Sequence, residues 1–395
     1  MAKRGVLLGG VLLVALLAAL LIEHNLSVEL PAPTGAFAVG RWTTTFVDDR
    51  IDPFAPSPGQ KRELFVWIWY PAAAGQTGAT MDDYLPAPLG AEVDRHTPAL
   101  FRFLTRDRSK VHAHSIRDAD VSSGERSYPV VIMRAGASSE VWNYSTLAED
   151  LASHGYVVVG FDAPYRTGVV VFPDGRVISR LPENNPERCE EQPLAQQSSC
   201  VSKVLNGWTA DVGFTLDRLE RMNADPAGKV TGRLDMTRVG VFGHSFGGAT
   251  AAQFCHDDSR CKAGIDLDGQ LFGSVVQEGL HQPFMFILSS QIHSSDPETR
   301  QILANIQSIY DRLPPDGRLR IEIRGANHFL FSDDGALLKS HLVMGTLRTL
   351  GILGIEGRRQ LAVTAYCVHS FFDRYLKGER LAISSAVYPE IQDVR

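Results

Sequence analysis

Residues 238–249 read Arg-Val-Gly-Val-Phe-Gly-His-Ser-Phe-Gly-Gly-Ala, and this run restricts the local backbone strongly. The apolar residues before Gly243 suit a buried strand, and the small residues after Ser245 can begin a helix. The pattern is typical of a nucleophile elbow, a sharp strand-to-helix turn that lifts a serine hydroxyl above the edge of a parallel sheet. Side chains at Gly243 and Gly247 would collide with the neighbouring strand and helix. We therefore expect Ser245 to be a nucleophile.

Strand-like and helix-like segments alternate along most of the chain, which is typical of a parallel sheet covered on both faces. Apolar runs and amphipathic periodicity locate these segments. The predicted strands are 41–47, 64–70, 128–133, 156–161, 238–242, 262–267, 283–289 and 319–324, and the predicted helices are 99–104, 144–153, 204–222, 298–312 and 359–376, with one more after Ser245. The first two strands suit an antiparallel edge. The predicted fold class is α/β, of the α/β-hydrolase type, with a mostly parallel central sheet.

Near the N-terminus, an apolar run at residues 5–22 follows Lys3 and Arg4. As a helix rising about 1.5 Å per residue it would span about 27 Å, the short end of a membrane crossing. Basic residues ahead of such a run favour a cytoplasmic N-terminus and an exported remainder. We expect an uncleaved signal-anchor that holds the protein to the membrane, with a cleaved signal peptide and secretion as the alternative. The expected organisation is a signal-anchor or signal peptide at 1–22, a tether at 23–40, and a catalytic domain at 41–395 with insertions near 71–127 and 166–203.

The cysteines fit an exported protein. Cys189 and Cys200 bracket a polar loop, and Cys255 and Cys261 bracket a shorter one. In an oxidising compartment each pair can form a disulfide, with free thiols as the alternative. Cys367 lies in an apolar helical pattern, where we expect a buried small hydrophobe.

Charge and histidine spacing argue against two classes of ligand. The formal net charge is −6 and no basic stripe is present, which argues against a nucleic-acid partner. His112 and His114 have no accompanying carboxylate or third ligand, so we expect them in a solvated loop rather than a metal site. The sequence predicts no metal and no cofactor.

The remaining members of a catalytic set follow Ser245 in the chain. A serine hydroxyl needs a base to take its proton, and the base needs an orienting carboxylate. In the α/β-hydrolase fold they occur in the order serine, acid, histidine, each after a later strand. His328 is the expected base. Asp268, at the end of a predicted strand, is the expected acid; Asp266 within that strand more plausibly makes a structural hydrogen bond, and Asp162 precedes the serine.

Two backbone N–H groups are expected to stabilise the oxyanion that forms during acyl transfer. One belongs to Phe246, the residue after the nucleophile, and the other to Ala137 in the loop after the first central strand. His244 is expected to point away from the site. An acyl pocket could be walled by Trp142, Tyr144, Phe272 and Phe329.

Three longer motifs make the pattern more specific. They are Gly-His-Ser-Phe-Gly-Gly-Ala-Thr at 243–250, Gly-Ile-Asp-Leu-Asp at 264–268 and Gly-x-x-His-x-x-Phe-x-Asp at 325–333. With these motifs the chain resembles the plasma-type platelet-activating-factor acetylhydrolase family and its bacterial α/β-hydrolase relatives, over roughly residues 40–377.

The resemblance implies a calcium-independent serine esterase similar to a 1-alkyl-2-acetylglycerophosphocholine esterase. Such enzymes release short or oxidised acyl groups from phospholipids, and some relatives cleave other esters. It implies Ser245 as nucleophile, Asp268 as acid and His328 as base, the same set that chain order predicts. The chain departs from the family at Ala135, where a histidine commonly precedes the glycine.

Together these observations predict an exported serine ester hydrolase that acts through an acyl-enzyme on short-chain or oxidised acyl esters, phospholipids among them. An acyltransferase or a peptidase of the same fold would use the same residues. A catalytically silent, membrane-tethered binding protein is the alternative from a different class.

Overall fold

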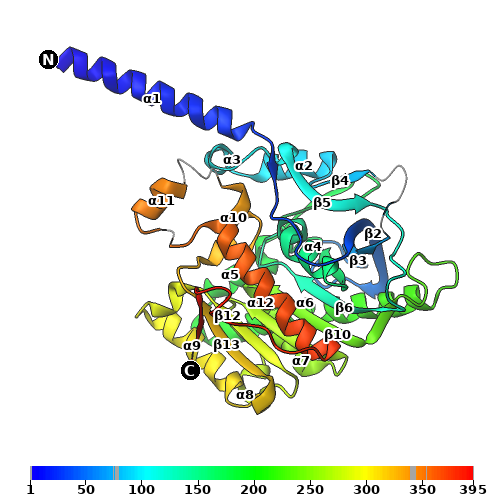
Figure 1. The fold of residues 1–395 in the computed structure, drawn as a ribbon. Coiled ribbons are helices and arrows are strands. Elements are labelled where there is room, and N and C mark those ends of the chain that lie inside the picture. The colour runs from blue at the N-terminus through cyan, green and yellow to red at the C-terminus, as the bar shows by residue number, and fades with distance from the viewer. Residues whose placement is uncertain (1, 74, 76–79, 339–343, 353, 395) are drawn as a thin grey trace.

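Twelve strands of the described chain form one sheet (Figure 1). The computed structural model describes residues 2–73, 75, 80–338, 344–352 and 354–394. In chain order the strands are β1 (Val28–Glu29), β2 (Ala38–Ile51), β3 (Lys61–Ala72), β4 (Met81–Asp83), β5 (Val111–Arg117), β6 (Tyr128–Arg134), β7 (Val157–Asp162), β8 (Val169–Val171), β9 (Val177–Ser179), β10 (Leu234–His244), β11 (Cys261–Leu267), β12 (Phe284–Leu288), β13 (Arg318–Ile323) and β14 (Ile391–Asp393). Across the sheet the order is β1-β5-β2-β3-β7-β6-β10-β11-β12-β13-β14, with β4 paired to β5, while β8 and β9 form a separate ribbon.

The centre of the sheet is parallel, as predicted. Neighbours from β7 through β13 all pair in parallel, whereas β3 pairs antiparallel with both β2 and β7. The predicted antiparallel pair at 41–47 and 64–70 is confirmed as β2 and β3, in which Trp42 lies opposite Ile68. The parallel strands place their carboxyl ends at one edge, where loops carrying reactive side chains can meet.

Helices cover both faces of the sheet. In chain order the α-helices of the described residues are α1 (Ala2–His24), α2 (Ala87–His96), α3 (Ala99–Leu104), α4 (Ser145–Ser153), α5 (Pro186–Glu190), α6 (Leu194–Ala224), α7 (Phe246–Asp257), α8 (Val275–Glu278), α9 (Pro297–Tyr310), α10 (Asp334–Leu337), α11 (Gly345–Thr349) and α12 (Gly357–Lys377). Successive residues of β10 face opposite layers: Phe242 packs in a core with Phe371 of α12, and Val241 packs in a second core with Trp208 of α6. The predicted α/β class is confirmed.

The segment around His112 and His114 differs from its predicted conformation. We expected His112 and His114 in a solvated loop, but both lie in β5. Val111, Ala113 and Ser115 are buried on alternate positions of that strand, so β5 is a half-buried strand that pairs with β2 and β4. The prediction was wrong because small and polar residues at the buried positions weaken the apolar alternation.

The N-terminal helix α1 extends away from the rest of the chain (Figure 1). The side chains of residues 1–8, including Lys3 and Arg4, lie outside the described residues. Within the described part of the chain, no helix is long and apolar enough to cross a membrane, so the expected signal-anchor gains no support. The expected tether at 23–40 contributes β1 and bonds to α4, where the hydroxyl of Thr34 donates to Asp150 at 2.7 Å.

Both predicted cysteine pairs are disulfides. Cys189 bonds to Cys200 within the 166–203 insertion, and Cys255 at the end of α7 bonds to Cys261 at the start of β11. Cys367 is a buried free thiol, and burial raises its pKa.

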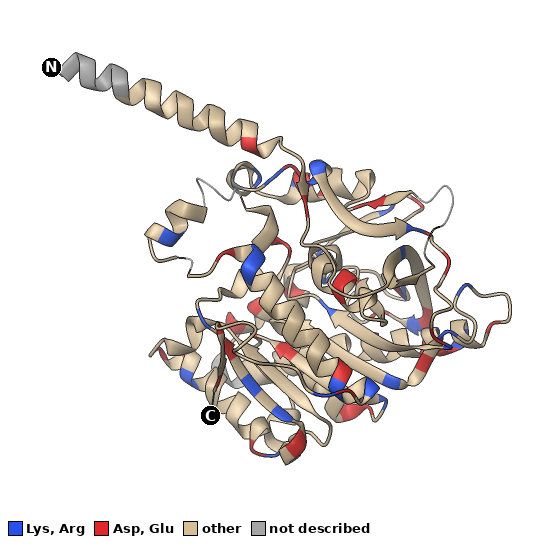
Figure 2. Ribbon diagram, in the orientation of Figure 1, with Lys and Arg blue, Asp and Glu red and all other residues tan. Residues whose placement is uncertain are grey.

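Basic and acidic residues are interspersed over the chain rather than gathered in a stripe (Figure 2).

Candidate active site

The turn at Ser245 has the backbone of an elbow. β10 leads directly into α7 with Ser245 between them at φ 55° and ψ −124°, a conformation that non-glycine residues rarely adopt. A Cβ at Gly247 would lie 2.4 Å from the carbonyl oxygen of Arg134, at the end of β6. A Cβ at Gly243 would lie 2.2 Å from the carbonyl oxygen of Gly247. Strand, turn and helix therefore pack too closely for any side chain at either glycine, as predicted.

Asp268 and His328 meet beside this turn. The Nδ1 atom of His328 lies 2.8 Å from Oδ2 of Asp268, at the distance of a charge-assisted hydrogen bond. The other carboxylate oxygen of Asp268 accepts the backbone N–H of Ser289 at 2.7 Å. Burial raises the pKa of Asp268, but the hydrogen bond and charge of His328 and the bonds from Ser289 outweigh it, so the pKa lies below its ordinary value. Asp268 is thus a carboxylate at neutral pH.

The loops that carry this pair are fixed by bonds to neighbouring elements. The backbone N–H of Asp268 donates to the carbonyl of Ile287 in β12 at 2.8 Å. His328 begins the 3₁₀ helix η6 (His328–Phe331), and the buried Gln360 of α12 holds the preceding residue, Asn327, by two backbone hydrogen bonds of 2.9 and 2.8 Å. The sequence offered no sign of Gln360, because it lies on an otherwise amphipathic helix.

Ser245, Asp268 and His328 line one cavity of about 260 Å³. Four aliphatic side chains form part of its wall: Leu288, Ile292, Ile302 and Leu303. No hydrogen bond between Ser245 and His328 is present among the described residues. In serine hydrolases without substrate this contact is often long and tightens in the reacting complex.

The loop after β6 lies against the elbow. A Cβ at Gly136 would come within 3.3 Å of the Ser245 Cβ, so this loop passes directly beside the serine. Within the described residues, the backbone N–H groups of Phe246 and Ala137 are engaged in no hydrogen bond. Ser138 continues the loop with φ 63°, a left-handed conformation that turns the chain. The loop after β6 and the turn at Ser245 therefore lie side by side, and each contains an N–H group with no partner in the described residues.

Two other carboxyl groups considered as the acid lie elsewhere. Asp266 is buried in β11, accepts the backbone N–H of Gly269 at 2.9 Å, and would collide at 1.7 Å with a Cβ at Gly248. Burial, and then the charge of Asp268, raise its pKa well above the ordinary value. Asp162 of β7 accepts the indole N–H of Trp67 at 2.9 Å. Neither bonds to His328, so both fit structural roles.

Tyr144 and His244 connect the elbow with the neighbouring loop, a role that the sequence did not predict for either residue. The Tyr144 hydroxyl accepts the backbone N–H of Gly136 at 3.3 Å and contacts Nδ1 of His244 at 2.8 Å. We expected His244 to point away from the site, but its ring lies 4.6 Å from that of His328. Burial, and then the charge of His328, lower the pKa of His244 to about 3. His244 is therefore neutral at neutral pH, and its Nδ1 can accept a hydrogen bond from the Tyr144 hydroxyl.

Tyr144→Phe removes the hydroxyl of this network. We expect a loss of about 1–2 kcal/mol in the free energy of unfolding, because a backbone N–H and an imidazole nitrogen lose their shared partner. We also expect kcat for an ester substrate to fall about tenfold with little change in KM, because the loop that carries Ala137 is less firmly held. Urea unfolding and steady-state kinetics measure both.

Tyr156→Phe is the matched control for this variant. Tyr156 is also buried and donates its hydroxyl to Asp373 at 2.8 Å, outside the network at the elbow. It should lose stability and keep kcat. Equal kcat values for the two variants would contradict the positioning role of Tyr144.

The expected aromatic pocket wall is not assembled at Ser245. Trp142 is buried edge-on against Tyr84 and lines a separate hollow. Phe272 packs on Phe246 and lines an adjoining hollow of about 450 Å³. Phe329 is 69% exposed, with its ring edge-on to His328. The cavity at Ser245 takes its apolar surface from α9, the end of β12 and the 3₁₀ turn Ser290–His293 instead.

A parallel-centred sheet with a serine elbow after β10, a carboxylate after β11 and a histidine after β13 defines an α/β hydrolase. The chain belongs to the family described as platelet-activating factor acetylhydrolase, isoform II, whose family model matches residues 22–167 and 178–377.

The curated relatives are similar over smaller parts of the chain than the family model. The probable 1-alkyl-2-acetylglycerophosphocholine esterase of Arthroderma benhamiae is 26% identical over 282 residues, which cover 67% of this chain and 65% of the relative. The platelet-activating factor acetylhydrolase of Bos taurus is 29% identical over 238 residues, which cover 55% of this chain and 50% of the relative. The chain thus spans between half and two-thirds of these curated relatives. Ferulic acid esterase from Streptomyces cinnamoneus is 28% identical with a TM-score of 0.75, covering 93% of this chain and 100% of that structure's chain.

Proposed function

We propose that this chain is a serine ester hydrolase that works through an acyl-enzyme. The observation that carries the proposal is the 2.8 Å contact of His328 with Asp268 in the cavity that Ser245 also lines. A buried carboxylate that holds Nδ1–H of a histidine leaves Nε2 to act as a base toward a nearby hydroxyl. Three side chains from three separate loops thereby supply nucleophile, base and orienting acid.

The reaction follows from these roles. His328 Nε2 accepts the proton of the Ser245 hydroxyl as its oxygen attacks the ester carbonyl, and Asp268 stabilises the imidazolium that forms. The N–H groups of Phe246 and Ala137 stabilise the oxyanion. The alcohol leaves with the proton from His328, and an acyl group remains on Ser245. Water then attacks the acyl-enzyme with His328 again as base, which releases the acid and regenerates the serine.

The cavity supports a small acyl group. Its volume of about 260 Å³ and its aliphatic wall favour a short chain. The polar residues Gln270, Glu298 and Thr299 line the remainder of the cavity and suit a hydrophilic part of the substrate. Family membership favours acetyl esters of glycerophosphocholines, the substrate in the name of the Arthroderma benhamiae relative. We include short oxidised acyl esters of the same lipids in the proposal.

A second substrate class is favoured by a specific observation. The ferulic acid esterase of Streptomyces cinnamoneus aligns with 93% of this chain and all of its own, whereas the curated relatives align over little more than half to two-thirds of it. An aromatic acyl ester such as a feruloyl ester is therefore the second candidate substrate for the same residues.

An ester panel separates these substrates and tests the proposal. It contains nitrophenyl esters of increasing acyl length, acetylated and oxidised-acyl glycerophosphocholines, and a feruloyl ester, each with Ser245→Ala as the background. We expect activity on short acyl esters that falls as the chain lengthens beyond what the cavity holds. A wild-type protein that hydrolyses no ester above the Ser245→Ala background would refute the proposal.

We also propose that the protein is exported and that residues 41–395 form one catalytic domain. Two disulfides support an oxidising compartment. The single sheet from β2 to β14 supports one domain; the insertion near 71–127 contributes β4 and β5 to that sheet, and the insertion near 166–203 contains the separate β8–β9 ribbon. Fractionation of cells that express the full chain should recover activity outside the cytoplasm; recovery only in the cytoplasm would contradict export.

A further inference from the structure

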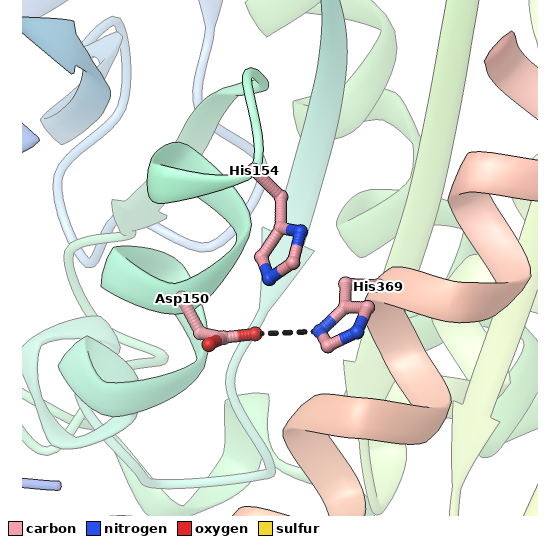
Figure 3. A group of neighbouring side chains, drawn as sticks. All are labelled: Asp150, His154 and His369. Atoms are coloured by element: carbon pink, nitrogen blue, oxygen red, sulfur yellow. Dashed lines mark hydrogen bonds and ion pairs between the residues drawn. The ribbon is translucent and has the colours of Figure 1, made fainter. Parts of the chain in front are cut away.

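Three side chains of the types that bind transition metals converge where α4 packs against α12. Asp150 lies in the last turn of α4, His154 follows one turn later, and His369 comes from α12 (Figure 3). One potential ligand atom from each lies within 4.8 Å of the others. Figure 3 shows the carboxylate directed at the His369 ring, with the His154 ring alongside. None of the three lines the cavity at Ser245.

The cluster is already ordered by contacts among its members. Oδ2 of Asp150 lies 2.9 Å from Nδ1 of His369, and the two imidazole rings stack with their centroids 3.9 Å apart. The second oxygen of Asp150 accepts the backbone N–H of Thr34 at 3.0 Å and its hydroxyl at 2.7 Å. That hydroxyl also lies 2.9 Å from Nε2 of His154. One carboxylate oxygen is therefore oriented by protein donors while the other faces an imidazole nitrogen.

The spacing requires only small side-chain movements to hold an ion. Zinc bonds to imidazole nitrogen and carboxylate oxygen are about 2.0–2.2 Å long, so tetrahedral ligand atoms lie about 3.4 Å apart. One pair, in Asp150 and His369, is already closer than that. Rotations of the His154 ring and the carboxylate that shift their ligand atoms together by about 1.4 Å at most would bring the third ligand atom to the same separation.

An ion can reach these ligands. Asp150, His154 and His369 line a hollow of about 290 Å³, together with Thr34 and Tyr366 among others. The hollow gives room for a water molecule as a further ligand. Two imidazoles and one carboxylate form a donor set that favours zinc and similar divalent transition metals over calcium or magnesium, which prefer oxygen ligands.

We propose that Asp150, His154 and His369 bind one Zn²⁺ ion, which cross-links α4 to α12. Because two helices that contact the sheet on one face would be joined through the ion, its binding would stabilise the folded chain. The site is independent of the proposed esterase activity, since it uses none of the residues assigned to ester hydrolysis. The competing interpretation is a purely hydrogen-bonded cluster that never holds a metal.

Calorimetric titration of the full-length protein with Zn²⁺, after removal of bound metals by a chelator and of the chelator by dialysis, tests the site. We expect one equivalent to bind and Tm to rise as Zn²⁺ is added. His369→Ala should weaken Zn²⁺ binding by more than about tenfold, because a direct ligand is lost. His112→Ala removes an exposed histidine of β5 and should bind as the wild type does. Mg²⁺ in place of Zn²⁺ should give no binding.

Two further measurements keep the test decisive if His369→Ala does not fold. Asp150→Asn retains the side-chain size and should also weaken Zn²⁺ binding, and Co²⁺ added to the wild-type chain should give the visible absorption of a nitrogen-containing, tetrahedral site. Ser245→Ala should bind Zn²⁺ as the wild type does, which separates this site from the esterase. Absence of stoichiometric binding in the wild type, or unchanged binding in both His369→Ala and Asp150→Asn, would overturn the proposal.

Discussion

Ser245→Ala is expected to lower kcat for ester hydrolysis by about 10⁴-fold or more, the scale on which serine hydrolases lose activity without their nucleophile. The alanine retains the Cβ, so the turn at φ 55° should form as in the wild type. Only the hydroxyl is lost, and its absence removes the covalent step. The measurement is the initial rate on a short-chain nitrophenyl ester, with Tm measured in parallel.

Ser295→Ala is the control for the loss of a serine hydroxyl. Ser295 is exposed and lies outside the residues that line the cavity. This variant should keep the wild-type rate. Comparable rates for Ser245→Ala and Ser295→Ala would contradict the assignment of the nucleophile.

Asp268→Asn is the second variant with a large expected effect, a fall in kcat of about 10⁴-fold. The amide presents its NH₂ group or a neutral oxygen to His328 Nδ1 in place of the carboxylate that lies 2.8 Å away. The histidine is then held in the wrong tautomer, and the imidazolium that forms during attack loses its counter-charge. The pH–rate profile of kcat/KM provides the measurement, because the loss should persist over the whole range.

Asp266→Asn is its matched control, because Asp266 lies two residues away and bonds to Gly269 rather than to His328. Burial, and then the charge of Asp268, raise the pKa of Asp266 well above the ordinary value, which favours the uncharged acid that the neutral amide resembles. This variant should keep kcat within a small factor. If Asp266→Asn lost as much activity as Asp268→Asn, the contact of Asp268 with His328 would not be enough to assign Asp268 as the acid.

The sequence predicted the elements that carry reactive residues because each has a strong local signal. The elbow is encoded by glycines whose replacement would bring a side chain within 2.4 Å of backbone atoms, so the motif itself reports the packing. β11 is a mostly apolar strand that ends directly before Asp268. β13 alternates charged and apolar residues, and it ends at Ile323, shortly before His328. Their parallel order places both loops at one sheet edge, which chain order alone can indicate.

Other parts of the site depend on contacts between distant residues. Tyr144 and His244 are 100 residues apart, and no spacing rule relates them. The cavity wall formed by Ile302 and Leu303 belongs to the amphipathic stripe of α9, which in sequence is indistinguishable from ordinary core packing. Aromatic residues near the elbow drew attention instead, yet Trp142 is buried against Tyr84.

The metal-ligating cluster escaped sequence analysis for a similar reason. Asp150 and His154 are spaced to share a helix face, but their partner on α12 lies more than two hundred residues further along the chain, with a separation of 219 between Asp150 and His369. In contrast, His112 and His114 attracted attention because they are close in sequence. As alternate residues of β5 they lie on one face of the strand, but two histidines alone do not make a metal site.

The most direct test of the central claim is to locate the covalent adduct formed by a fluorophosphonate probe. Peptide mapping by mass spectrometry of the labelled wild-type protein should find the phosphonyl group on Ser245, and labelling should fall together with ester hydrolysis. Labelling should be slowed in Asp268→Asn and absent in Ser245→Ala. An adduct on another residue, or full ester hydrolysis by a protein that the probe does not label at Ser245, would contradict the account.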